Sequence, residues 1–155
     1  IADRSPSEVL VGLQAGIERD FPDAPETAEA ITRVAEVRAA RLPARDAVQM
    51  LSELRASHPG LPRRLDLLEL QAVIAKDGLR DCGLALPAYR ELAAASRGVQ
   101  RAEAQAWRGI CAHHQGFTTE AVQALGDAQT GPLSPELREV VEQALERIEL
   151  LEGAF

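Results

Sequence analysis

One short segment brings together side chains that could do chemistry, Cys111, His113 and His114. On a helix, Cys111 and His114 would share a face, so they could bind one metal ion or act as a nucleophile and its base. A tetrahedral metal site needs two more ligands, and the sequence holds no second cysteine–histidine pair to supply them. We therefore predict a buried cysteine used for packing, and histidines whose positive charge is favourable at the end of a helix.

The other cysteine, Cys82, lies 29 residues before Cys111 and is not part of a CxxC motif. In a chain of 155 residues with an adequate core, two buried free thiols are expected. A disulfide between them is the alternative, and it would imply an oxidising compartment. The compartment stays open: the cytoplasm is favoured, and the periplasm is the alternative if a longer parent protein carries a signal sequence.

Carboxylates are frequent near the C-terminus, but their spacing is typical of a solvated helix face. They are Glu139, Glu142, Glu146, Glu149 and Glu152. General acid–base catalysis needs carboxylates whose pKa values are driven apart inside a pocket, and nothing in the sequence indicates such a pair. Phosphate-binding glycine motifs, serine-hydrolase motifs and zinc-protease motifs do not occur in it. We predict a protein that is not an enzyme and that uses no cofactor and no metal.

Charge and hydropathy limit the partners. With 17 basic and 24 acidic residues, the net charge is −7, which argues against nucleic-acid binding because that affinity depends on lysine and arginine. No apolar run reaches the roughly 18 residues of a membrane-spanning helix. One stretch is rich in arginine and is expected to be a solvated rim; the alternative partners are an acidic peptide and, less favoured, a nucleic-acid backbone. It contains Arg38, Arg41, Arg45, Arg55, Arg63 and Arg64.

Prolines, glycines and capping residues divide the chain into eight predicted helices, and no segment alternates with a period of two. The expected helices cover about 6–20, 25–40, 43–57, 65–76, 81 or 86–96, 100–115, 118–128 and 135–152. Pro87 would either begin or kink the fifth of them. The length and 46% hydrophobic composition fit one all-α domain. Since the sequence begins at Ile1 without a methionine, we expect a piece of a longer protein.

Three predicted helix pairs share an alanine in their second helix, at Ala47, Ala88 and Ala121. Each is followed by leucine four residues later and by leucine or alanine seven residues later. Gly109 and Gly116 precede the third alanine by twelve and five residues. Small residues at these positions let antiparallel helices approach closely, and the leucine fills the layer beneath. The pattern therefore predicts repeated helical hairpins.

This pattern resembles the tetratricopeptide repeat, a helix–turn–helix unit of about 34 residues. The resemblance implies a right-handed helical-hairpin solenoid of about three repeats with a capping helix at each end. The repeats would cover 28–60, 61–98 and 99–132, and the capping helices 6–20 and 135–152. The sequence departs from the family pattern in its first interval of 41 residues and in its aromatic positions. A helical-hairpin solenoid of another class is the alternative.

Carried over by spacing, the concave peptide-binding groove of that family falls on thirteen residues of this chain. They are Glu29, Thr32, Glu36, Leu70, Val73, Asp77, Arg80, Asp81, Glu103, Ala106, Ile110, His113 and His114. Its apolar middle and acidic flanks suit an extended or helical peptide with apolar anchors and a basic flank. The alternative is that some of these side chains face a neighbouring helix. Exposed histidines there would make binding depend on pH between about 6 and 7.

The predicted function is therefore a protein–protein interaction module that binds a peptide or protein segment. The alternative is a self-associating structural spacer of a larger assembly, a homo-oligomer in which the apolar face of the last helix docks another copy.

Overall fold

The computed structural model describes residues 8, 9, 11–13, 15, 16 and 25–153. These residues form helices and short connections, and no strand occurs among them, so the prediction of an all-α protein is confirmed. The chain divides into two compact units, Ile1–Leu79 and Arg80–Phe155. Most of the helix predicted over 6–20 lies outside the described residues.

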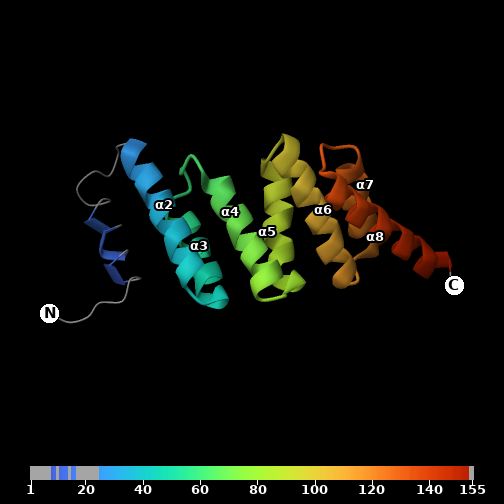
Figure 1. The fold of residues 1–155 in the computed structure, drawn as a ribbon, viewed down its shortest axis with the longest axis horizontal. Coiled ribbons are helices and arrows are strands. Elements are labelled where there is room, and N and C mark those ends of the chain that lie inside the picture. Colours follow the sequence, from blue (N-terminus) through green and yellow to red (C-terminus); the bar gives the residue numbers. More distant parts are fainter. Residues whose placement is uncertain (1–7, 10, 14, 17–24, 154–155) are drawn as a thin grey trace. The chain divides into compact units, whose positions relative to one another are not determined.

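Over residues 25–79, the first unit contains three α-helices and a π-helical extension (Figure 1), and the described residues before them, 8, 9, 11–13, 15 and 16, are also helical. They are α2 (Pro25–Arg41), α3 (Ala44–Ser57), α4 (Arg64–Val73) and η1 (Ile74–Gly78). Pro43 stands directly before α3, where its fixed φ suits a helix start. Ala35, Ala47 and Leu51 are fully buried in an aliphatic core, which confirms that the first predicted alanine packs inward.

The end of α4 differs from the prediction of an ordinary helix over 65–76. From Ile74 the chain turns as a π-helix, and the amide of Leu79 donates a hydrogen bond to the carbonyl of Ile74 over 3.1 Å. A Cβ on Gly78 would lie 3.1 Å from the Cβ of Ala44. The glycine thus allows the wider turn to lie close to the start of α3.

The second unit contains α5 (Cys82–Ala95), α6 (Gly98–His114), α7 (Thr118–Gln129) and α8 (Pro135–Gly153). The Asp81 carboxylate accepts a hydrogen bond from the Leu84 amide over 2.9 Å, which caps α5. The helix therefore begins at the earlier of the two predicted starts, and Pro87 lies inside it. Similarly, the Ser134 hydroxyl accepts a hydrogen bond from the Leu137 amide at the start of α8.

The close helix approach predicted at Gly109 and Ala121 is seen in the packing of α6 on α7. A Cβ on Gly109 would lie 2.5 Å from Cγ of Leu125 and 3.1 Å from the backbone oxygen of Ala121. Ala121 and Leu125 are fully buried. The exception in the wider pattern is Ala95, seven residues after Ala88, which is exposed.

The two cysteines form a disulfide, so the prediction of two free thiols is wrong. The bond joins the first residue of α5 to the last turn of α6, with 4.9 Å between the Cα atoms of Cys82 and Cys111. The 29 residues from Cys82 to Cys111 run along α5 and back along α6. The start of α5 and the end of α6 therefore lie side by side. The bond staples this hairpin at that end.

Candidate interaction surface

The cysteine–histidine segment offers neither a nucleophile nor a metal site. The sulfur of Cys111 is bonded to Cys82, and Cys111 is fully buried. His113 and His114 lie in the last turn of α6, as the sequence predicts, with ring centroids 6.2 Å apart. Over residues 25–153 and the described residues before them, no group of three or more metal-ligating side chains is close enough to hold an ion.

In the first unit, the side chains at the predicted groove positions on α2 already make contacts within the protein. Thr32 is only 1% exposed and its hydroxyl donates to the carbonyl of Ala28, so its side chain offers no contact area. Glu36 and Glu29 are paired with Arg63, at 2.8 and 3.6 Å. Arg63 also donates a hydrogen bond to Asp66. This hydrogen bond, together with the charges of the neighbouring carboxylates, raises the pKa of Arg63. Arg63 is therefore more than a solvated rim residue, and it neutralises much of the predicted acidic flank.

The remaining predicted positions of the first unit lie on α4 and η1. Leu70 is half-buried, while Val73 and Asp77 are exposed. The Asp77 carboxylate is 3.1 Å from the Lys76 ammonium. An apolar strip is thus open to solvent on α4, but it is narrow.

In the second unit, two predicted positions have structural roles. Ala106 is fully buried, and Asp81 caps α5. Others keep accessible side chains: Arg80 and His114 are exposed, and Glu103, Ile110 and His113 are half-buried. Of the predicted positions on α6, all except Ala106 are therefore at least partly exposed to solvent.

His113 lines a cavity of about 240 Å³ between α6, the start of α7 and the second half of α8. Its other lining residues are Thr118, Ile148, Leu151 and Glu152. We call it the His113 cavity. The sequence analysis named His113 as a groove position, but it expected α8 to be a capping helix or, in the alternative, a self-docking face, and did not predict its part in this cavity.

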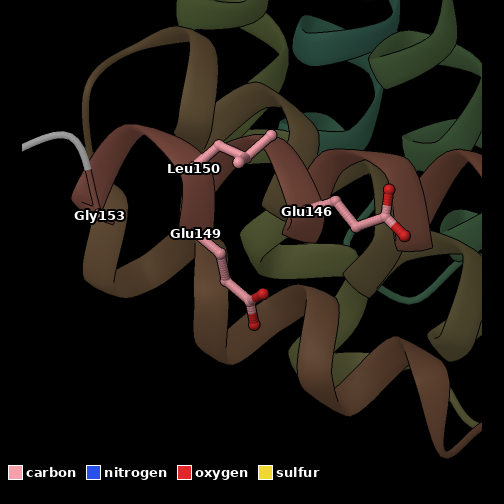
Figure 2. A pocket seen from close by; sticks show the side chains of 4 residues that line it. All are labelled: Glu146, Glu149, Leu150 and Gly153. Carbon is pink, nitrogen blue, oxygen red and sulfur yellow. The ribbon is translucent and has the colours of Figure 1, made fainter.

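The last turns of α8 extend past α7 in Figure 1 and carry a surface hollow of about 500 Å³ that shares no lining residue with this cavity. Figure 2 shows its side chains, in which Glu146, Glu149 and Leu150 project from one helix. Leu150 is 74% exposed and the neighbouring Leu151 is 56% exposed. We use the name α8 surface for the exposed end of this helix, with Glu146, Glu149 and Leu150 at the hollow on one face and Leu151 and Glu152 at the His113 cavity on another.

A charged cluster that the sequence analysis missed links α5, α6 and α7. The guanidinium of Arg90 donates two hydrogen bonds to Glu120, at 2.6 and 2.8 Å, and Arg108 donates a third at 2.8 Å. The hydrogen bonds from Arg90, supported by Arg108, lower the pKa of Glu120 to about 2. Arg90 also lies over the Phe117 ring, 5.7 Å from its centroid. This cluster positions α7 and leaves no free acid or base.

The repeat register contains a signal for this cluster. Arg90 comes two residues after Ala88, and Glu120 comes one residue before Ala121. The two alanines mark equivalent positions in predicted hairpins. Arg90 and Glu120 are therefore expected at similar levels along the axes of neighbouring helices.

None of the helices among the described residues combines the length and apolar character needed to cross a bilayer. No protein-family model, curated protein or solved structure matches the chain. Its function is therefore inferred from its own side chains.

Proposed function

We propose that this protein is an interaction module that binds a peptide or protein segment, on the helical-hairpin solenoid that the tetratricopeptide-like spacing predicts. The observation that supports the proposal best is the α8 surface, where exposed Leu151 lines the His113 cavity beside Glu152 and exposed Leu150 lies with Glu146 and Glu149 on another face of the helix. The binding surface then includes α8 in addition to the predicted positions on α6.

Leu150 and Leu151 are the energetic centre of this surface. Complete burial of a leucine side chain contributes about 1.5–3 kcal/mol, and both side chains are more than half exposed without a partner. An apolar anchor of the partner would enter the His113 cavity and cover Leu151. Micromolar affinity needs about 8 kcal/mol after the cost of association, so further contacts along α6 must contribute.

The charges around the leucines select a basic partner. Glu146, Glu149 and Glu152 stand on the same helix end, with Arg147 as the basic residue among them. Lysine or arginine beside the apolar anchor would meet Glu152, and a basic residue farther along the partner would meet Glu146 and Glu149. The net charge of −7 would speed the association of such a partner.

The proposal is tested by selecting peptides from a random displayed library against the full chain. We expect enrichment of peptides that combine an apolar anchor with neighbouring lysine or arginine. Leu151→Ala should weaken binding of a selected peptide about tenfold, which corresponds to about 1.4 kcal/mol, as measured by fluorescence polarisation. Val99→Ala is the matched control, because Val99 is 54% exposed on α6 and does not line the cavity.

Selected peptides without apolar anchors, or full affinity of the Leu151→Ala variant, would contradict the proposal.

The self-associating spacer is the second candidate, and the exposure of Leu150 favours it as well. A second copy docked by the same face would place its glutamates against Glu146 and Glu149, and such like-charge contacts are unfavourable. Light scattering over a wide concentration range separates the candidates. A constant monomer mass supports the peptide-binding module, while a dimer that Leu150→Glu dissociates supports the spacer.

A further inference from the structure

The His113 cavity combines an apolar part with a polar part. Ile148 and Leu151 line it from one face of α8, and Ile148 is only 2% exposed. The polar side chains come from three helices: His113 from the end of α6, Thr118 from the start of α7, and Glu152 from α8. A side chain that fills this cavity therefore meets aliphatic surface and polar atoms at the same time.

The size of the cavity suits one side chain of a partner. Its volume of about 240 Å³ lies below the range of roughly 300–1,000 Å³ found for small-molecule sites. Aromatic side chains bring the largest contact area for a single residue and lose little conformational entropy when they are held. An aromatic anchor therefore uses this space better than an aliphatic one.

The polar atoms of the cavity have no partner within the protein. Over residues 25–153, the side chains of His113, Thr118 and Glu152 take part in no hydrogen bond or ion pair. The ring nitrogens of His113 and the hydroxyl of Thr118 are not buried, so they are open to solvent at the cavity. A purely apolar anchor would cover these atoms without replacing their hydrogen bonds to water, which is unfavourable.

The polar group of the anchor must therefore match a histidine and a threonine. The Thr118 hydroxyl both donates and accepts, and a histidine ring nitrogen can do either. A tyrosine hydroxyl also donates and accepts, so it can pair with both groups in any arrangement of their protons. The indole N–H of tryptophan only donates, and phenylalanine has no polar atom to offer.

We propose that the anchor recognised by the His113 cavity is a tyrosine with a neighbouring lysine or arginine, an inference that rests on the proposed function. The ring covers Ile148 and Leu151, and the phenolic hydroxyl forms hydrogen bonds with His113 and Thr118. The basic neighbour meets the Glu152 carboxylate. The chemistry of the partner is thereby narrowed from any apolar anchor to a tyrosine-containing basic segment.

A substitution series in a library-selected peptide tests the proposal. The anchor position is made tyrosine, phenylalanine, tryptophan or leucine in turn, and binding to the full chain is measured by fluorescence polarisation. Tyrosine should bind at least about tenfold more tightly than phenylalanine, because only its hydroxyl satisfies the polar atoms of the cavity. Equal affinity of the tyrosine and phenylalanine peptides would overturn the assignment.

Variants of the protein show whether the preference arises at this cavity. With His113→Leu and Thr118→Val combined, the preference for tyrosine over phenylalanine should disappear, while the phenylalanine peptide binds as well as before or better. Retained binding of that peptide also reports that the variant is folded. Thr119→Val is the matched control, because Thr119 is exposed on the same turn of α7 and does not line the cavity. A preference that survives in the double variant contradicts the proposal.

The tyrosine assignment and the proposed function fail in distinguishable ways. A selected peptide that binds the α8 surface through leucine, with no gain from tyrosine, overturns the assignment and leaves the interaction module intact. If the library yields no peptide, N-acetyltyrosinamide serves as the probe. At millimolar concentration it should shift the amide resonances of His113 and Thr118 more than N-acetylphenylalaninamide does, and equal or absent shifts overturn the assignment.

Discussion

At the scale of single residues, Glu120 and Gly109 determine how α7 is held in the second unit. Glu120 accepts hydrogen bonds from arginines of two other helices, and Gly109 lets α6 approach α7 without a side chain between them. The contact of Glu120 is electrostatic and lies near the surface of the unit. The contact of Gly109 is steric and lies in its core. They respond to different perturbations, which allows separate tests.

The Glu120 cluster should make stability depend on acid. The pKa of the Glu120 carboxyl falls from 4.5 to about 2 on folding. Its contribution to the free energy of unfolding is therefore complete above pH 4.5 and is lost as the pH drops toward 2. At neutral pH, Glu120→Gln should lower the free energy of unfolding by about 1–2 kcal/mol, a discounted value because Arg90 is largely solvated. Urea unfolding at several pH values measures this, and the difference from the natural chain should vanish near pH 2. Glu142→Gln, at an exposed position of α8, is the control; an equal effect of both substitutions would contradict the assignment.

The contact at Gly109 predicts opposite effects for two glycines. Gly109→Ala should destabilise the unit by about 1–3 kcal/mol, because its Cβ would overlap Leu125. Gly126→Ala on α7 is the matched control, since a Cβ there meets nothing within 4 Å, and alanine should stabilise the helix by up to about 1 kcal/mol. Thermal unfolding of both variants measures the two effects. A Gly109→Ala variant that is as stable as the natural chain would show that the register of α6 on α7 is wrong.

At the scale of elements, residues close in sequence made the helix ends predictable. Asp81 and Ser134 cap α5 and α8 through amides three residues away, so their signal is local. The π-helical turn of η1 had no such signal, because its wider turn lies against Ala44 of another helix. The disulfide was also unpredictable from spacing, because it depends on which helix ends become neighbours.

Reduction of the disulfide should weaken the α5–α6 hairpin. Closing a loop of 29 residues stabilises a fold by about 3–4 kcal/mol when the main effect is on the unfolded chain. Chemical unfolding with and without a phosphine reductant should show a loss of this size. In Cys82→Ala, the loss should be present already and the reductant should add nothing. Two reactive thiols in the denatured, unreduced protein would contradict the bond.

At the scale of the whole molecule, the candidate surface was only partly predictable. His113, one of the groove positions chosen by family spacing, lines a cavity together with α8. Family spacing also selected Thr32 and Ala106, which are buried, because spacing marks a helix face without showing which neighbour covers it. The α8 surface was missed, because the repeat pattern ends before α8 and gives it no role except as a cap. Each of the two units must therefore be judged by its own exposed side chains.

The central claim is that the end of α8, with the neighbouring part of α6, recognises an apolar and basic segment. A titration of the isotope-labelled chain with a library-selected peptide, followed by NMR, tests this claim most directly. The account predicts saturable amide shifts at His113 and along 146–152, and their loss in the Leu151→Ala variant. Shifts confined to residues outside this region, or unchanged in that variant, would contradict it.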